Sequence, residues 1–221
     1  LPRLQRNIGQ DFFLAGCPRR DWFAEQEKNL ATLPRIVGGV TSECTDRAVD
    51  ALSQISWKIL PTTYRTAELT KALENALLHV PVMFAHQLAW ALPDHDVAEA
   101  LRLAGTHWRL TPLYLGFGSG GRCVPLGTQY LVHATNGRLT MGEEAVAWDA
   151  QMRALIAEVV SRRLEAMREK SVLVLGIAYR PNFRDAGLSP GMAVAKHLHG
   201  SGISVFVHDP MWTTQELHAL T

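Results

Sequence analysis

Two long stretches of the chain carry apolar residues at intervals of three and four, which is the spacing of an amphipathic helix. These stretches are roughly Thr63–Leu92 and Glu143–Arg168. Pro81 lies inside the first, and a proline within a helix removes a backbone hydrogen bond at a cost of about 3 kcal/mol. We therefore expect either a kink at Pro81 or two helices that meet there. A shorter helix is expected over residues 96–103.

Short apolar runs flank this helical middle and predict strands. They are DFFLAG at 11–16, PRIVGGV at 34–40, SVLVLGIAY at 171–179 and ISVFV at 203–207. The run at 171–179 is apolar throughout, as in a strand covered on both faces. Thr41 or Ser42 caps a helix that reaches about Ile55, and Ser189-Pro190 begins another that ends at Gly200. Strand–helix units of this kind are typical of an α/β fold with a right-handed crossover.

The patterns divide the chain into three segments. Residues 1–55 and 169–221 read as α/β, and residues 56–168 read as helical. A single βαβ unit forms a poor sheet by itself, and the chain does not begin with Met. We therefore expect the chain to be part of a longer protein.

Composition excludes several classes of function. The 221 residues are 47% hydrophobic with a net charge of +1, and no run of Lys or Arg suggests a nucleic-acid surface. The longest apolar run is too short to span a bilayer, so no membrane protein is predicted. The 3 cysteines are widely spaced, which argues against a disulfide framework and fits a cytoplasmic protein. The histidines lack ligand spacing, so no metal site is predicted.

The most unusual stretch is GFGSGGRCVP at residues 116–125. Its glycines, Gly116, Gly118, Gly120 and Gly121, allow backbone N–H groups to form an anion-binding concavity beside Cys123. The alternative is a turn-rich loop whose cysteine is simply buried. The G-x-G-x-x-G match here is not a dinucleotide fingerprint, because no buried strand leads into it and prolines flank it.

Four segments, taken in order, resemble the UDP-glucose/GDP-mannose dehydrogenases, which are nucleotide-sugar 6-dehydrogenases. They are DFFLAGCPRR with PRIVGGVTSEC, TAELTKALEN, GFGSGGRCVP, and VLVLGIAYRPNFRDAGLSP with VFVHDP. The resemblance implies an N-terminal NAD-binding Rossmann domain, largely absent here and ending near residue 55. It implies a helical dimerisation domain over 56–168 with a long central helix, and then the first βαβ of a Rossmann-like nucleotide-sugar domain over 169–221.

The resemblance also implies the chemistry. NAD takes two hydrides from the sugar C6, and Cys123 forms first a thiohemiacetal and then a thioester that water hydrolyses to the acid. Lys71 and Asn75 flank the oxyanion; they are four residues apart and share one helix face, although a solvated face with Glu68 and Glu74 is the alternative. A lysine charge near Cys123 also favours the reactive thiolate. The resemblance further implies substrate contacts for the loop glycines, Arg109 and Arg180, and a homodimer formed through the long helix.

The sequence departs from the family at several places. The acidic residue four positions after the cysteine is Gly127, the Glu of Pro-Glu-Arg is Arg19, and the Arg of Asp-x-Arg-x-Ser is Gly187. In the long helix, Pro81 and Gln87 replace a typical Asn and Glu. These departures leave a second hypothesis open. In it the chain is a non-oxidising relative that binds a nucleotide or nucleotide sugar, or serves a structural role.

Overall fold

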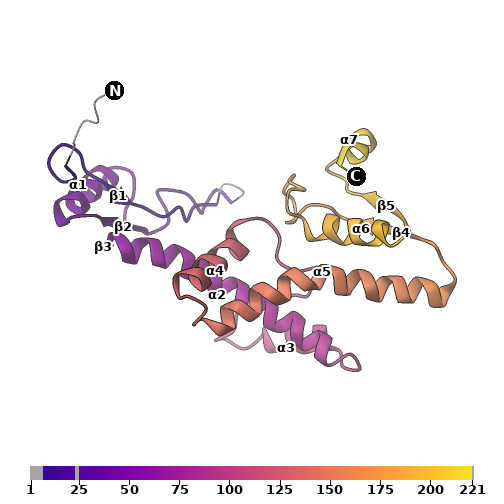
Figure 1. Cartoon of the computed structure of the whole chain (residues 1–221). Helices are drawn as coiled ribbons and strands as arrows, with labels where there is room; N and C mark the ends of the chain where they lie inside the picture. Colours follow the sequence, from indigo (N-terminus) through magenta and orange to yellow (C-terminus); the bar gives the residue numbers. More distant parts are fainter. Residues whose placement is uncertain (1–6, 23–24, 221) are drawn as a thin grey trace. The chain divides into compact units, whose positions relative to one another are not determined.

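The computed structural model describes residues 7–22 and 25–220 (Figure 1). The chain forms two compact units, Leu1–Glu74 and Asn75–Thr221, whose boundary falls inside the long helix α2 (Tyr64–Ala91). The three segment boundaries expected from the sequence stay predictions. None of the helices in the described part of the chain has the length and apolar character needed to cross a membrane.

The first unit contains one small sheet and its covering helix. Strands β2 (Arg35–Gly39) and β3 (Ile59–Thr63) pair in parallel, from Arg35↔Ile59 to Gly39↔Thr63, and α1 (Ser42–Ser53) connects them. The side chain of Thr41 accepts a hydrogen bond from the N–H of Cys44, which confirms the predicted cap. Strand β2 is buried at all five positions, as its apolar run predicted.

The predicted strand at 11–16 is much shorter than expected. Only β1 (Ala15–Gly16) is a strand, and it pairs antiparallel with β2. Phe12 and Phe13 are exposed rather than buried. Strand β1 is the edge strand of the sheet β1-β2-β3, and residues 13–14 of the apolar run lie outside it.

Two adjacent glycines let the elements of the first unit pack closely. A Cβ on Gly38 would overlap the carbonyl of Thr63 and lie 2.8 Å from the backbone nitrogen of Tyr64. A Cβ on Gly39 would lie 2.7 Å from the Cβ of Cys44 in α1. The two glycines at the end of β2 therefore permit close packing of this strand against β3 and α1.

Helix α2 is continuous through Pro81, so the expectation of two separate helices is wrong. The proline ring leaves the carbonyl of Leu77, four residues earlier, without its helical donor. Leu77 is exposed, so water can hydrogen-bond that carbonyl.

The second unit packs three more helices into its helical part: α3 (Val97–Ala104), α4 (Cys123–Ala134) and α5 (Thr140–Met167). Met83 of α2 meets Ala145 and Met152 of α5 in one buried cluster. Further along α5, Ala157 packs against Val194 and Leu198 in a second cluster. Helix α5 therefore belongs to both cores.

The end of the chain forms the predicted βαβ unit. Strands β4 (Ser171–Leu175) and β5 (Ser204–His208) pair in parallel, and α6 (Pro190–Gly200) joins them. Ser189 caps α6 as expected. The expectation that 171–179 is covered on both faces is wrong, because α6 packs on one face and Leu173, Leu175 and Phe206 are exposed. Helix α7 (Thr214–Leu220) was not predicted.

Gly38 gives a direct test of the packing in the first unit. Gly38→Ala should lower the free energy of unfolding by about 1–3 kcal/mol, because the added methyl overlaps backbone that cannot easily move. Urea unfolding measures the change. Gly200→Ala is the control: nothing lies within 4 Å of a Cβ at that helical position, so it should be neutral or stabilising by up to about 1 kcal/mol. Equal effects of the two variants would contradict the packing described here.

Candidate active site

Cys123 is the first residue of helix α4, directly after the glycine loop at 116–122. Its side chain is exposed, so the alternative of a buried cysteine is wrong. Pro125 lies in the first turn, where its missing N–H removes no helical bond, and the first bond of the helix runs from the N–H of Leu126 to the carbonyl of Arg122 at 3.1 Å. The loop therefore presents a thiol at the N-terminal end of a helix.

Neighbouring side chains explain three of the loop glycines. Gly118 has φ of +111°, and a Cβ there would lie 2.7 Å from Oδ1 of Asp149. A Cβ on Gly120 would lie 2.6 Å from the Cβ of Tyr179, and one on Gly121 would lie 3.0 Å from its ring. These glycines make room for a carboxylate on one side and an aromatic ring on the other.

Several N–H groups of the loop are already used by acceptors within the protein. Ser119 donates its N–H to Oδ1 of Asp149 at 2.9 Å, and Gly116 donates to Nε2 of His86 at 2.8 Å. The N–H of Gly121 points to the carbonyl of Leu188 at 3.3 Å. The open row of N–H groups expected from the sequence is therefore wrong at these positions. Substrate contacts by Gly116, Gly118, Gly120 and Gly121 stay predictions.

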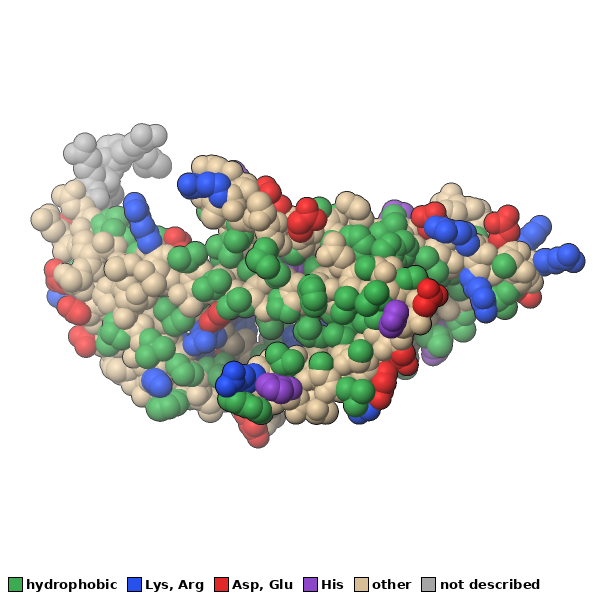
Figure 2. All heavy atoms as spheres, turned by 90° about the horizontal axis from the view of Figure 1, so that it is seen from below, with side chains coloured by type: hydrophobic (Ala, Val, Ile, Leu, Met, Phe, Trp, Pro, Cys, Tyr) green, Lys and Arg blue, Asp and Glu red, His purple; other side chains and the backbone are tan. Residues whose placement is uncertain are grey.

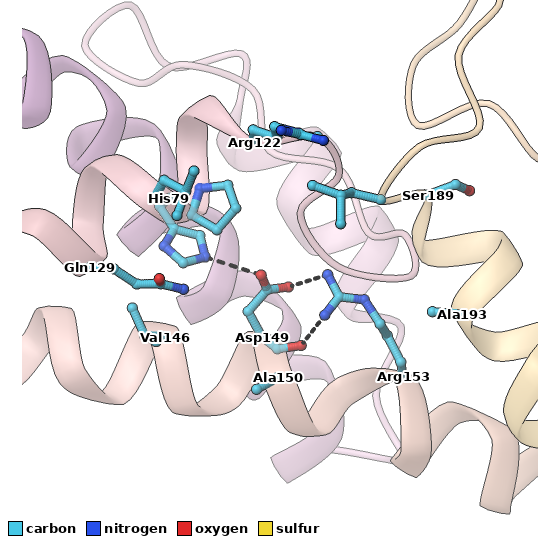
Figure 3. A pocket seen from close by; sticks show the side chains of 13 residues that line it. His79, Arg122, Gln129, Val146, Asp149, Ala150, Arg153, Ser189 and Ala193 are labelled. Carbon is cyan, nitrogen blue, oxygen red and sulfur yellow. Dashed lines mark hydrogen bonds and ion pairs between the residues drawn. The ribbon is translucent and has the colours of Figure 1, made fainter.

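A cavity of about 540 Å³ opens beside this loop. Its polar lining includes His79, Arg122, Gln129, Asp149, Arg153 and Ser189 (Figure 3). His79, Asp149 and Arg153 follow one another along one wall, joined by the dashed lines of Figure 3. Cys123 is not among the lining residues, although its neighbours Arg122 and Pro125 are.

Asp149 of α5 is buried and heavily hydrogen-bonded. Besides the N–H of Ser119, it accepts the Ser119 hydroxyl at 2.6 Å, and Nη2 of Arg153 lies 3.4 Å from Oδ1. Burial acts to raise the pKa of Asp149, but His79, the two bonds from Ser119 and the charge of Arg153 outweigh it and lower the pKa overall. Asp149 therefore lies beside the loop as an ionised carboxylate.

Asn75 of α2 packs directly against α4. A Cβ on Gly127 would overlap the Cβ of Asn75 and lie 2.8 Å from its Nδ2. Gly127 is one helical turn after Cys123, so the two share a face of α4. The structure therefore brings Asn75 to the face of α4 that begins with the cysteine.

Three further predicted side chains, those of Lys71, Arg109 and Arg180, come from separate parts of the chain. Lys71 belongs to the first compact unit, and its Nζ lies 3.8 Å from Oε2 of Glu74. Glu74 also pairs with Arg20 at 2.7 Å. Arg109 is exposed, with its guanidinium stacked over the Trp108 ring. Arg180 is exposed and follows Tyr179 in the turn after β4. Their roles stay predictions.

Comparison with known proteins points to one family. Residues 65–148 match the model of the UDP-glucose/GDP-mannose dehydrogenase family, central domain. The chain is similar to this family. It is 25% identical over 204 residues to a UDP-N-acetyl-D-mannosamine dehydrogenase of Campylobacter jejuni, covering 90% of this chain and 50% of the relative. It is 30% identical over 200 residues to the enzyme of that name from Salmonella typhi, covering 85% and 47%.

Solved structures agree with this assignment. The UDP-D-ManNAc dehydrogenase from Pyrococcus horikoshii superimposes with a TM-score of 0.86 at 28% identity, over 93% of this chain and 51% of that one. An NDP-N-acetyl-D-galactosaminuronic acid dehydrogenase from Methanosarcina mazei gives a TM-score of 0.78 at 27% identity, over 93% and 48%. The chain therefore spans about half the length of the relatives it matches.

The places where the chain departs from the UDP-glucose/GDP-mannose dehydrogenase pattern have local explanations. Gly127 has no room for a side chain because Asn75 lies against it. Arg19 is exposed and pairs with Asp21 at 2.8 Å. Gly187 donates its N–H to Oδ1 of Asp185 at 2.7 Å. Each position has become part of a local contact instead of presenting the family side chain.

Sequence reasoning missed His79, Asp149 and Arg153. The only signal for the last two is that they are four apart on a predicted helix, the spacing of an ordinary surface ion pair. His79 gives no signal, because its partners Thr128 and Asp149 are far away in the sequence.

The lowered pKa of Asp149 makes stability depend on pH. A carboxyl whose folded pKa is below its unfolded value of about 3.9 stabilises the fold above that value and loses the effect as pH falls through the folded pKa. Asp149→Asn should therefore be less stable than the unmodified protein at about pH 7, and the difference should shrink below about pH 4. Urea unfolding across this range measures it. A difference that stays constant down to about pH 3 would contradict the assignment.

Proposed function

We propose that the chain is the cysteine-bearing part of a nucleotide-sugar 6-dehydrogenase, which oxidises the C6 alcohol of a UDP- or GDP-sugar to the acid. The observation that carries the proposal is an exposed Cys123 at the start of α4, after a glycine loop held by Asp149, in a chain that matches this family's central domain. The relatives named above are all dehydrogenases, so they do not favour the non-oxidising alternative.

We propose that NAD binds the first unit. A cavity of about 790 Å³ lies at the carboxyl ends of β2 and β3, where parallel α/β sheets bind dinucleotides. Gly39, Thr41, Thr62 and Thr63 line it and would face the cofactor. When bound, NAD supplies the hydride-accepting nicotinamide for both oxidations.

The chain's own residues supply the covalent chemistry. The Cys123 thiol gives up its proton to solvent, and its sulfur bonds to the aldehyde carbon while the carbonyl oxygen takes the negative charge. Loss of a hydride from that carbon to the nicotinamide would leave the thioester. The Asn75 amide, on the helix that packs against α4, donates to the oxyanion, with Lys71 proposed as the second group. Water later cleaves the thioester C–S bond, which releases the acid and restores the thiol. A reducing cytoplasm keeps that thiol free.

Gly127 affects the last step. No carboxylate stands at this position to act as a general base for the attacking water, and such help is worth roughly 10²–10⁴-fold. We therefore expect thioester hydrolysis to be slow compared with the oxidation that precedes it.

The protein at its full natural length, incubated with NAD and a panel of UDP- and GDP-sugars, should form NADH with one of them. Because hydrolysis is slow, a burst of NADH should precede the steady state, and mass spectrometry should find the acyl group on Cys123. Cys123→Ser should abolish the adduct and acid formation. Cys17→Ser, which changes the other exposed cysteine, is the matched control and should behave like the unmodified protein.

Two results would count against this function. Folded Cys123→Ser protein that still forms acid would exclude the thioester route. Absence of NADH with every sugar, together with calorimetric binding of one of them, would instead support the non-oxidising alternative.

We also propose that a second copy of the chain covers an apolar face of α2. Leu69, Leu73 and Leu77 recur every four residues along this helix and are 54%, 44% and 65% exposed. Apolar side chains are exposed over much of the face drawn in Figure 2. Leucines on one helix face are a standard basis for helix–helix association, and the resulting homodimer is the one the family resemblance implied.

Leu77→Glu should convert a dimer to a monomer in light scattering with size-exclusion chromatography, because a buried unpaired carboxylate opposes association. Leu77 is mostly exposed within the chain, so the fold should survive. Leu103→Glu changes a leucine of α3 that is 54% exposed and should leave the dimer intact. A Leu77→Glu protein that stays dimeric would exclude this face as the interface.

A further inference from the structure

Ser119, four residues before Cys123, is held by three polar contacts to α5. Its N–H and hydroxyl both donate to the Asp149 carboxylate, at 2.9 and 2.6 Å. Its carbonyl accepts from Nη2 of Arg153 at 2.8 Å. Arg153 also donates to the backbone carbonyl of Asp149 at 3.2 Å, which holds its guanidinium against α5.

His79 of α2 anchors the other side of the cysteine. Its side chain is 0% exposed, and Nδ1 lies 3.0 Å from the hydroxyl of Thr128, five residues after Cys123. Its Nε2 lies 3.5 Å from Oδ2 of Asp149 and finds no hydrogen-bond partner among the described residues. A fully buried imidazole nitrogen is costly to leave unpaired, and the negative charge of Asp149 offsets part of that cost.

Asp149 and His79, which hold the two sides of the cysteine, lie next to each other. The segment 119–128 carries Cys123, and its ends are tied to Asp149 and His79, which face each other inside the second unit. The cysteine itself is exposed. Its position is therefore set by what holds the segment on either side.

We propose that Asp149 and His79 are positioning residues that fix Cys123 through the two ends of its segment. The inference rests on the proposed function, in which Cys123 is the nucleophile. It deepens that function by assigning control of the nucleophile to a buried pair that does not touch the substrate. Misplacing a reacting atom by about 1 Å costs on the order of 10²-fold in rate, which is why such a pair would matter.

The proposal requires a carboxylate and not merely a side chain of that shape. Ser119 donates two hydrogen bonds to the two oxygens of Asp149. An asparagine keeps the shape but offers one acceptor oxygen, and its NH₂ group would face the other donor. Losing a hydrogen bond to a charged group should open the loop about tenfold more often.

The experiment compares Asp149→Asn, His79→Gln and Ser119→Ala in the Cys17→Ser background, which removes the other exposed thiol. Amide hydrogen exchange of the peptide containing Ser119, and the rate of Cys123 alkylation by iodoacetamide, are measured without any sugar. Glu158→Gln, which changes an exposed residue of α5, is the matched control.

Asp149→Asn should raise exchange at the loop about tenfold and change the alkylation rate, while the peptides of α2 and α5 exchange as before. With substrate, kcat should fall and KM should stay within about twofold. The double variant with Ser119→Ala should be little worse than Asp149→Asn alone, because both remove the same contact.

Loop exchange and alkylation equal to those of Glu158→Gln in all three variants would overturn the proposal. If Asp149→Asn does not fold, Ser119→Ala and His79→Gln decide in its place. Because exchange and alkylation need no sugar, they test the positioning even if oxidation fails. Loss of acid formation only in Cys123→Ser, with all three positioning variants fully active, would overturn the positioning role and leave the proposed function standing.

Discussion

A buried carboxylate must be hydrogen-bonded, and at Asp149 this requirement organises the loop that carries the cysteine. Two donors come from Ser119 and a cation comes from Arg153 one turn along the same helix. Gly118 has no side chain because the carboxylate occupies that space. The loop's glycine content thus follows in part from an anion supplied by the protein itself, placed where the sequence suggested that a ligand would bind.

Helix α5 connects this interaction to the rest of the second unit. It contributes Asp149 to the loop, Met152 to the core with α2, and Ala157 to the core with α6. A change in how α5 packs against either core would be transmitted to Ser119 without any contact between the changed residue and the cysteine. The rigidity of one helix therefore sets the precision of a site built on a loop.

The sequence predicted the elements well where local patterns decide them. The run at Arg35–Gly39, the cap at Thr41 and the Ser189-Pro190 helix start all depend on neighbours a few residues away. The family followed from ordered motifs. Coverage by other layers was not predictable in the same way, which is why Phe12, Phe13 and Leu173 turned out to be exposed. An apolar run shows that a strand can be buried and does not show what covers it.

The hydrogen-bonded group around Asp149 and His79 could not be predicted, because its members are far apart in the sequence. Ser119 and Asp149 are separated by 30 residues, and His79 and Thr128 by 49. Each looks like an ordinary polar residue until the helices are assembled. The role of Gly127 could not be predicted either. The sequence showed only that a carboxylate was missing there, whereas the structure shows a close helix contact with Asn75.

That helix contact limits how the chain could change in evolution. With the backbone as it stands, a Cβ at 127 would overlap the Cβ of Asn75. An acidic residue at 127 therefore requires α2 and α4 to move apart locally. Regaining that carboxylate would take a change in helix packing as well as the substitution itself.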